Sequence, residues 1–383
     1  MATSSRAIMN FEYSTIDEYQ IEITSYCNAA CPQCPRNKLG GAINPYMPLT
    51  HLKQEVINNA FSVDLCQRLR QVFFCGSYGD PIMHPNFLEI LRNFRQKNPT
   101  LWLYFHTNGG VHDTDYWQEV ADIMAGYGQI DFGVDGLSDT LDIYRRNVKF
   151  DQVIKNAQAF INAGGRAQWN FIVFQHNQHQ VDTARTISQD MGFFNFLTRR
   201  TGRFFHHGHE EEMDVWPIHD RRGQQIGQIH PPSDPQWRNP STARLPELKK
   251  EYGDLTTYFD TTPIKCDALI GNKVAINAEG LVLPCNFFNH NLYDARFYLD
   301  VLPGANRLHS HDGKNQVRSF LESYGLENIN ICHRSLSDIF DCRMWKDLVD
   351  SWNKTRAQGR LFECAMTCGE KFTKVWDQGG NNR

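Results

Sequence analysis

The chain has 383 residues, 41% of them apolar and 12% aromatic, so it can bury the core of one large domain or two ordinary ones. Its 39 Lys and Arg against 43 Asp and Glu give a formal charge of −4, which provides no electrostatic footprint for nucleic acid or an anionic membrane. No run of about 18 apolar residues is present, and residues 1–6 lack the apolar segment of a signal peptide. We therefore expect a soluble, cytoplasmic protein with no nucleic-acid or membrane partner.

Short apolar or β-branched runs alternate with longer amphipathic stretches between residues 20 and 202. Six runs have the length of buried strands: Gln20–Thr24, Val72–Gly76, Trp102–Thr107, Ile130–Asp135, Arg166–Val173 and Phe194–Thr198. Helical periodicity lies between them, at Asn86–Gln96, Asp115–Ala125, Asp151–Ala163 and Val181–Asp190. This alternation is typical of parallel strands with right-handed helical crossovers. We predict an α/β fold with a partial (β/α)6 TIM-like barrel, although an open sheet would give the same pattern, and we expect the chemistry at the C-terminal ends of the strands.

The flanking segments have a different character. Residues 1–19 form an N-terminal extension before the first strand. Residues 203–262 contain His206, His207 and His209 and several prolines, and they predict a long irregular insert or linker. We interpret the histidines as part of a solvated loop, because no second ligand set matches their spacing.

Residues 263–383 contain six cysteines and predict a small α+β domain. Lys273–Asn277 and Leu281–Leu283 have the pattern of a β-hairpin with Gly280 at the turn. Ser335–Asn353 has apolar residues near helical spacing and predicts one or two helices.

Eleven cysteines need an explanation in a reducing compartment, where clustered thiols bind metal or do chemistry more often than they form disulfides. Cys27, Cys31 and Cys34 lie in one loop directly after the first predicted strand. Four thiolates would saturate a four-iron cubane, so three leave one iron open to a substrate or cofactor. The alternative, a closed structural zinc site, would need a fourth ligand, and none is obvious nearby.

The C-x3-C-x2-C spacing resembles the signature of the radical S-adenosylmethionine (SAM) superfamily, and further motifs agree with it. Residues 75–81 are similar to the glycine-and-acid motif of that superfamily, and 107–109, 134–136 and 144–146 follow the next strands where related enzymes bind SAM. The resemblance implies that Cys27, Cys31 and Cys34 hold a catalytic [4Fe–4S] cluster that binds SAM. The implied SAM contacts are Gly76, Ser77, Tyr78, Gly79, Asp80, Thr107, Asn108 and Asp135, with Arg145 or Arg146. Gln33 stands where the family usually has a bulky residue against adenine, so the adenine contacts are expected to differ.

The spacing of Cys266, Gly280 and Cys285 resembles the opening motif of the auxiliary-cluster domains called SPASM and twitch. Full SPASM domains use seven cysteines for two clusters, whereas the twitch form holds one cluster. The six cysteines here imply one auxiliary [4Fe–4S] cluster, held by Cys266, Cys285, Cys364 and Cys368. The alternative for this set is a zinc ribbon, because spacing alone does not separate zinc from iron–sulfur.

Three cysteines remain outside these sets, apart from Cys75 in the glycine-and-acid motif. We interpret Cys332 and Cys342 as buried structural residues and Cys66 as core packing. Alternatively, Cys332 or Cys342 could ligate a second auxiliary cluster, or donate a hydrogen atom to a substrate radical as in radical epimerases.

The resemblance implies an enzyme that reductively cleaves SAM to a 5′-deoxyadenosyl radical and abstracts a hydrogen from its substrate. An auxiliary cluster would serve in electron transfer. Modification of a peptide or protein by oxidation, cross-linking or epimerisation is the first hypothesis, and dehydrogenation of a small molecule is the alternative. A non-catalytic iron–sulfur electron-transfer protein is a second alternative, against which the glycine-and-acid motif argues. Reduction of the cluster implies an electron donor such as a flavodoxin or ferredoxin.

Overall fold

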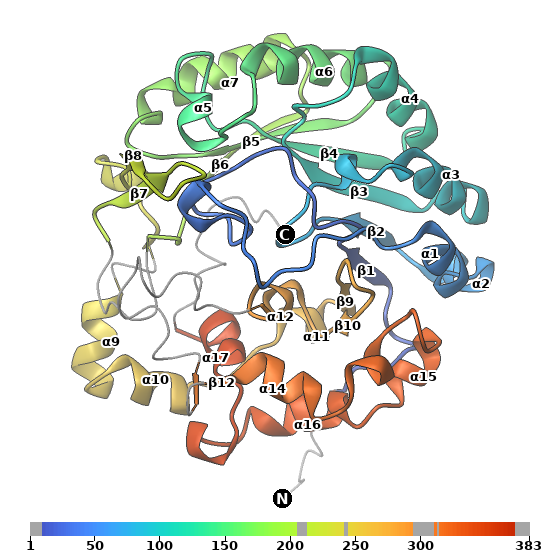
Figure 1. Ribbon diagram of the computed structural model, residues 1–383, viewed down its shortest axis with the longest axis vertical. Helices are drawn as coiled ribbons and strands as arrows, with labels where there is room; N and C mark the ends of the chain where they lie inside the picture. Colours follow the sequence, from blue (N-terminus) through green and yellow to red (C-terminus); the bar gives the residue numbers. More distant parts are fainter. Residues whose placement is uncertain (1–9, 205–212, 241–243, 294–309, 312–313, 372–383) are drawn as a thin grey trace, which may run out of the picture.

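The computed structural model describes residues 10–204, 213–240, 244–293, 310–311 and 314–371. Its centre is an eight-stranded sheet in the order β10-β9-β1-β2-β3-β4-β5-β6, with helices around the outside (Figure 1). Six of these strands are parallel neighbours: β1 Glu18–Ile21, β2 Gln71–Phe74, β3 Trp102–Thr107, β4 Gly128–Gly133, β5 Ala167–Ile172 and β6 Asn195–Arg199. The predicted α/β partial barrel is confirmed, with strand ends shifted by a few residues.

The helices that connect the strands form the outer layer of the barrel (Figure 1). They are α1 Gln54–Ala60, α2 Val63–Arg68, α3 Phe87–Lys97, α4 Thr114–Met124, α5 Leu141–Tyr144, α6 Phe150–Asn162 and α7 Val181–Asp190. Polar residues define where some of them begin: the Asp113 carboxylate accepts a hydrogen bond from the Tyr116 amide at 3.0 Å at the start of α4. The four helices predicted from periodicity correspond to α3, α4, α6 and α7.

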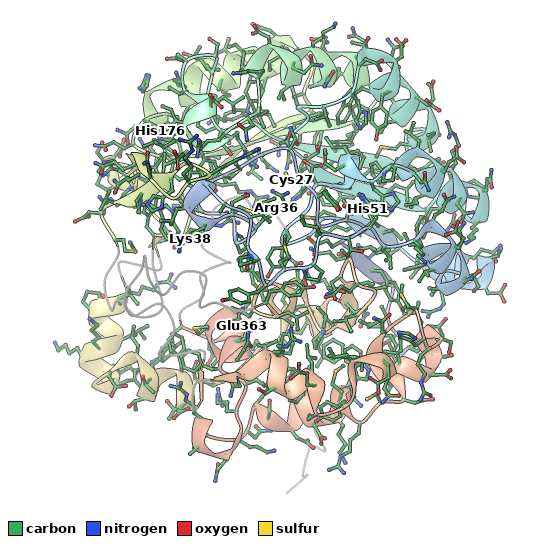
Figure 2. The ribbon with its side chains drawn as sticks, viewed as in Figure 1. Cys27, Arg36, Lys38, His51, His176 and Glu363 are labelled. Atoms are coloured by element: carbon green, nitrogen blue, oxygen red, sulfur yellow. The ribbon has the colours of Figure 1, made fainter. Side chains whose placement is uncertain are left out.

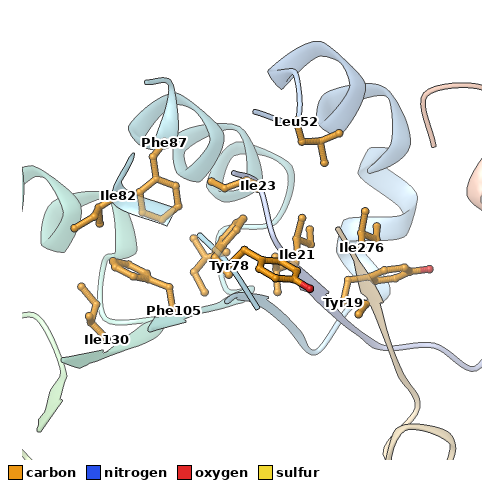
Figure 3. Packing of buried hydrophobic residues seen from close by; sticks show 14 of the residues in the cluster. Tyr19, Ile21, Ile23, Leu52, Tyr78, Ile82, Phe87, Phe105, Ile130 and Ile276 are labelled. Carbon is orange, nitrogen blue, oxygen red and sulfur yellow. The ribbon is translucent and has the colours of Figure 1, made fainter. Parts of the chain in front are cut away.

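Side chains of the strands alternate between two environments. In β3, Leu103 and Phe105 are fully buried under the helices, and Phe105 packs edge-on against Phe87 of α3 with ring centroids 5.1 Å apart (Figure 3). Tyr104 and His106 point to the opposite face of the sheet, the barrel interior, and are half-buried. β2 shows the same alternation. The barrel therefore has an apolar outer face and an interior lined by larger, partly polar side chains.

The C-terminal hairpin extends the barrel sheet. β9 Lys273–Ile276 pairs antiparallel with β10 Val282–Leu283, and Gly280 occupies the turn with φ 88°, which glycine adopts readily. The predicted hairpin is thus confirmed. β9 also pairs in parallel with β1, from Glu18 opposite Lys273 to Ile21 opposite Ile276, a contact the sequence pattern did not predict. The two halves of the chain consequently share one sheet and one core.

Part of the segment predicted as an irregular insert or linker is regular, so the expectation of irregular backbone is wrong there. It contains the hairpin β7 Trp216–His219 and β8 Gln225–Ile229 and the helices α9 Leu245–Tyr252 and α10 Leu255–Thr261. Such short helices give a weak local signal, because their stability comes from tertiary packing. Here Leu248, Tyr258 and Phe259 form a satellite core with residues of the last helix. His206, His207 and His209 lie outside the described residues.

The remaining C-terminal elements cover the lower part of the molecule in Figure 1. They are α11 Asp267–Ile270, α12 Asn286–His290, β11 Ser310–His311, β12 Lys314–Asn315, α14 Gln316–Glu322, α15 Leu336–Phe340, α16 Met344–Ser351 and α17 Phe362–Cys368. The helices expected within residues 335–353 are α15 and α16. None of the helices in the described ranges is both long and apolar enough to cross a bilayer.

Candidate active site

The loop after β1 brings the three N-terminal cysteines together. It crosses the centre of the view, where Cys27 is labelled (Figure 2). The Cys34 amide donates to the Cys31 carbonyl at 3.0 Å, and the Ala29 amide donates to Cys27 Sγ at 3.4 Å. Burial raises the pKa of Cys27 strongly, and the nearby Asp80, Cys31 and Cys34 raise it further. Burial is also the main reason that the pKa of Cys31 rises to about 11.

These three thiols fit a polynuclear iron–sulfur cluster better than a protein core. They are crowded sulfur donors whose negative forms repel one another, so bound metal cations are what would stabilise them as thiolates. Within the described ranges, no group of three or more His, Cys, Asp or Glu side chains stands in a metal-binding arrangement. The preference for a cluster over zinc at this loop rests on the donor set, three sulfurs in one loop.

The cysteine loop is held by the segment that was predicted as a linker. Trp216 Nε1 of β7 donates to the Pro32 carbonyl at 3.0 Å, and Arg203 donates to the Gln33 carbonyl at 3.3 Å. Arg146 Nη1 donates to the carbonyls of Gly40 and His219, at 2.8 and 2.6 Å. Arg146 thus ties the loop to β7 and is occupied there.

The glycine-and-acid loop after β2 packs against β1 so tightly that only glycine fits at two positions. A Cβ atom on Gly79 would overlap the Thr24 carbonyl, and one on Gly76 would overlap the Glu22 carboxylate. Glu22 Oε1 accepts the amides of Tyr78 and Gly79 at 2.7 and 2.9 Å, and its other oxygen accepts from the Asn289 side chain. Burial raises the pKa of Glu22 to about 7, although these hydrogen bonds oppose the shift.

Asp80 brings three of the predicted SAM contacts together. Its Oδ2 accepts from Thr107 Oγ1 at 3.1 Å and from the Asn108 amide and side chain at 2.9 and 2.8 Å. Asn108 Nδ2 lies 3.7 Å from Cys27 Sγ. Burial raises the pKa of Asp80 to about 6, against the effect of these donors. The second and third strand ends therefore meet beside the first cysteine.

Of the two candidate arginines, the structure brings Arg145 to the cysteines. Its Nε donates to the fully buried Asp135 carboxylate at 2.5 Å, and its Nη1 lies 4.0 Å from Cys31 Sγ. A Cβ atom on Gly133 would overlap this guanidinium, so the glycine makes room for it. Asp135 and Arg145 form a buried ion pair at the end of β4, next to the loop that would hold the cluster.

The other two predicted contacts of the glycine-and-acid loop face the C-terminal part of the chain. Ser77 Oγ lies 3.1 Å from Asn286 Oδ1, and Tyr78 donates its hydroxyl hydrogen to the Asn289 carbonyl at 3.0 Å. Both partners belong to α12, which starts directly after Cys285. The loop expected to meet SAM is therefore joined to the helix beside the auxiliary cysteines.

The four C-terminal cysteines converge from three separated segments. Cys266 and Cys285 stand immediately before α11 and α12, and Cys364 and Cys368 lie one turn apart on α17. All four line one small pocket together with apolar side chains such as Phe288. Burial raises the pKa of Cys285 to about 12, with Cys368 adding to the shift. A hydrogen bond between Cys368 and Cys266 and burial together raise the pKa of Cys368.

The remaining cysteines lie outside both sets. Cys66 is fully buried, as expected for core packing. Cys342 is half-buried, but Cys332 is exposed, with its Sγ 3.7 Å from the Glu279 carbonyl, so the prediction that Cys332 is buried was wrong. Cys332 begins an exposed stretch that continues through His333 and Arg334, and the local sequence does not show this.

The sequence analysis identified Gln33 as a departure at the adenine position, and the structure adds its environment. Both side-chain amide atoms of Gln33 are buried without a hydrogen-bond partner among the described residues, and the residue is only 6% exposed. Sequence reasoning missed His106 and Asp131, although they interrupt apolar strands. Polar residues at interior-facing positions of β3 and β4 were the available signal.

Comparison with known proteins identifies the barrel. Residues 21–188 match the sequence profile described as the Radical SAM superfamily. This part of the chain is a radical SAM enzyme domain. The match implies SAM and a [4Fe–4S] cluster as cofactors. No curated protein sequence matches this chain.

Several solved structures are similar to this chain at low sequence identity. Native anSMEcpe with bound AdoMet and Kp18Cys peptide has a TM-score of 0.51 and 13% identity, over 94% of this chain and 92% of that one. Streptococcus suis SuiB bound to S-adenosylmethionine has a TM-score of 0.48 and 16% identity, over 91% and 77%. BtrN in complex with AdoMet and 2-DOIA has a TM-score of 0.41 and 11% identity, over 95% and 96%.

The raised pKa of Glu22 predicts a pH-dependent effect of Glu22→Gln. Between the ordinary pKa of 4.5 and about 7, the unfolded chain ionises Glu22 while the folded chain keeps it protonated, so the wild type loses stability as the pH rises. Glutamine cannot ionise, so the variant should gain on the order of 2 kcal/mol relative to the wild type across this window. Urea unfolding at several pH values measures the difference.

Glu89→Gln serves as the control, because Glu89 is an exposed carboxylate on α3 and its removal reports the effect of losing one surface charge. If the Glu22→Gln difference depends on pH no more than the Glu89→Gln difference does, then burial does not hold Glu22 protonated in the folded protein.

Proposed function

We propose that the chain modifies a peptide or protein by radical oxidation, cross-linking or epimerisation, and that an auxiliary [4Fe–4S] cluster serves its electron transfer. The observation that carries the proposal is the convergence of Cys266, Cys285, Cys364 and Cys368, which lie up to about a hundred positions apart, around one pocket. Four sulfur donors around one pocket with apolar lining residues suit an iron–sulfur cluster.

The first site would be assembled from four strand ends. Cys27, Cys31 and Cys34 would hold the cluster, whose remaining iron is open to SAM. With the cofactors bound, reductive cleavage of SAM supplies a 5′-deoxyadenosyl radical that abstracts a substrate hydrogen. The chain's own contribution is placement: Asp80 orients Asn108 beside Cys27, and Arg145 sets a positive charge beside Cys31.

The two cofactor sites are connected through contacts of the described residues. Glu22 joins the glycine-and-acid loop to Asn289, and α12 runs from Cys285 to that residue. This arrangement supports a fixed position of the auxiliary cluster relative to the SAM site, as electron transfer requires. A flavodoxin or ferredoxin is the partner class proposed for reduction.

The peptide hypothesis and the small-molecule alternative have different support. The first agrees with the shared fold of anSMEcpe, a structure that contains AdoMet and a peptide. The polar groups on the barrel wall favour the second, dehydrogenation of a small polar molecule, as the alternative. Loss of two hydrogens per turnover would support dehydrogenation or cross-linking, whereas one solvent deuterium retained at an α-carbon would support epimerisation. The match of residues 21–188 to the radical SAM profile argues against the non-catalytic alternative.

Iron and sulfide counts test the cluster assignment. Anaerobically reconstituted wild type should contain about eight irons. The triple variant Cys27→Ala, Cys31→Ala, Cys34→Ala should retain about four, and so should a variant with alanine at Cys266, Cys285, Cys364 and Cys368, because each set holds one cubane.

Cys66→Ala is the matched control, since it removes a buried cysteine outside both sets and should leave the iron count unchanged. About twelve irons in the wild type would assign a second auxiliary cluster to the Cys332 and Cys342 region. An unchanged count in the triple variant would overturn the placement of the first cluster.

The orphaned amide of Gln33 predicts that it pairs with the adenine of SAM. An amide can bond the N6 and N7 positions of adenine at once, and Gln33 lies between two of the proposed cluster ligands. Gln33→Leu keeps the volume but removes both polar atoms, so SAM affinity should fall about tenfold, the equivalent of one hydrogen bond. Equilibrium dialysis against reconstituted protein measures this affinity.

Gln33→Glu is the companion variant. It keeps the acceptor but loses the donor, so it should also weaken SAM binding. Unchanged SAM affinity in Gln33→Leu, together with higher stability, would mean that Gln33 is only a poorly satisfied core residue.

A further inference from the structure

A network of polar side chains runs across three strands inside the barrel. Its members are not among the residues assigned to SAM or to a cluster. Cys75 Sγ, just after β2, lies 3.6 Å from His106 Nδ1 on β3. His106 Nε2 lies 3.2 Å from Asp131 Oδ2 on β4 and 2.6 Å from the Tyr104 hydroxyl. A thiol, an imidazole and a carboxylate are therefore linked in sequence across the interior face of the sheet.

The carboxylate of this network, Asp131, accepts several hydrogen bonds. Asp131 is inaccessible to solvent, and its Oδ2 accepts from Tyr104 at 2.6 Å and from Gln168 and Asn170 at 2.8 Å each. Burial alone would raise its pKa, but His106 and these donors lower it to about 2. Asp131 is thus a fixed negative charge that can stabilise a protonated imidazole.

The imidazole in the middle is held in position and is reachable from the interior. Phe73 packs edge-on against His106, with ring centroids 4.9 Å apart, and about 36% of the His106 side chain is exposed. Burial opposes protonation, yet Cys75 and Asp131 raise the pKa of His106 to about 10. The charged or titratable groups around it are Cys75 on β2, Tyr104 on β3, Asp131 on β4 and, beyond Tyr104, Arg199 on β6.

The Cys75 thiol is the member of the network that a bound molecule could contact. Both ring nitrogens of His106 are engaged, so a bound molecule would meet the relay at Cys75, which is half-buried. Gln20 Nε2 fixes the Cys75 backbone by donating to its carbonyl at 2.9 Å. Cys75 and His106 each precede by one residue a position assigned to SAM, Gly76 and Thr107, so the thiol borders the space where a substrate would face the cofactor.

We propose that Cys75, His106 and Asp131 form a proton relay that takes a proton from a hydroxyl or amino group of the substrate. This inference rests on the proposed radical oxidation, because removing a hydrogen atom from carbon and forming a double bond to oxygen or nitrogen also requires loss of that proton. Before the step, the Cys75 thiol proton rests on His106 Nδ1, and Asp131 balances the charge of the imidazolium. In the relay step, the substrate O–H or N–H bond breaks and an S–H bond forms at the Cys75 sulfur. No electron is transferred in this step.

The proposed substrate class follows from the position of Cys75. The carbon attacked by the radical should carry a hydroxyl or amino group, and that group should point to the Cys75 sulfur. General bases of this kind contribute about 10²–10⁴-fold to a rate.

Alkylation of Cys75 by iodoacetamide tests the relay without a substrate, because the thiolate is the reactive form. The reconstituted full chain is treated near neutral pH, and peptide mass spectrometry follows Cys75 against the exposed Cys332 as internal standard. His106→Gln should lower the Cys75 to Cys332 rate ratio about tenfold, because glutamine cannot take up the thiol proton. Asp131→Asn should lower it in the same direction.

His112→Gln is the matched control, since His112 bonds the Ile82 carbonyl and lies away from Cys75, and it should leave the ratio unchanged. If wild-type Cys75 reacts no faster than Cys332, the relay is overturned even where a variant fails to fold. An unchanged Cys75 to Cys332 alkylation rate ratio in folded His106→Gln would also overturn the relay. The iron count tests the cluster assignment separately, so failure of the relay and failure of the proposed function can be distinguished.

Discussion

The buried carboxylate of Glu22 is the contact on which the arrangement of both candidate cofactor sites depends. It lies at the end of β1, accepts the amides of Tyr78 and Gly79, and bonds the Asn289 side chain of α12. One side chain therefore fixes the glycine-and-acid loop and the helix after Cys285 relative to the strand that leads to Cys27. Because a buried acceptor left without donors is costly, these three segments cannot separate without a large loss of stability.

The outer face of the barrel strands carries apolar residues that stabilise the fold, and the inner face carries polar residues that could take part in chemistry. Outward residues such as Phe105 and Phe132 pack under the helices and leave no polar group to satisfy. Inward residues at the neighbouring positions, among them His106 and Asp131, bond one another across strands. Strand pairing aligns His106 directly with Asp131, so the register of the sheet sets the geometry of the interior network.

The sequence was sufficient to predict the barrel, because its strands and helices alternate with clear periodicity and its cysteines have a specific spacing. The pairing of β9 with β1 was not predictable, since it joins residues more than 250 positions apart and no local pattern encodes it. The helices α9 and α10 were missed because each is short and is stabilised by α17, far away in the chain. The interior network was missed for a related reason: Cys75, His106 and Asp131 become neighbours only through strand register.

The insert of residues 203–262 packs against the helix that carries two of the four auxiliary cysteines. α17 carries Cys364 and Cys368 and packs through Phe362 and Met366 onto α9 and α10. Cys266 and Cys285 lie beside α11 and α12, on the segments that flank the hairpin joined to β1. A cluster bound by all four cysteines would cross-link α17, which packs on α9 and α10, to the segments around α11 and α12. Its binding free energy would add to the free energy of folding. The same insert contributes Trp216, whose indole N–H donates to the Pro32 carbonyl in the loop of the first three cysteines, so both candidate sites are tied to one insert.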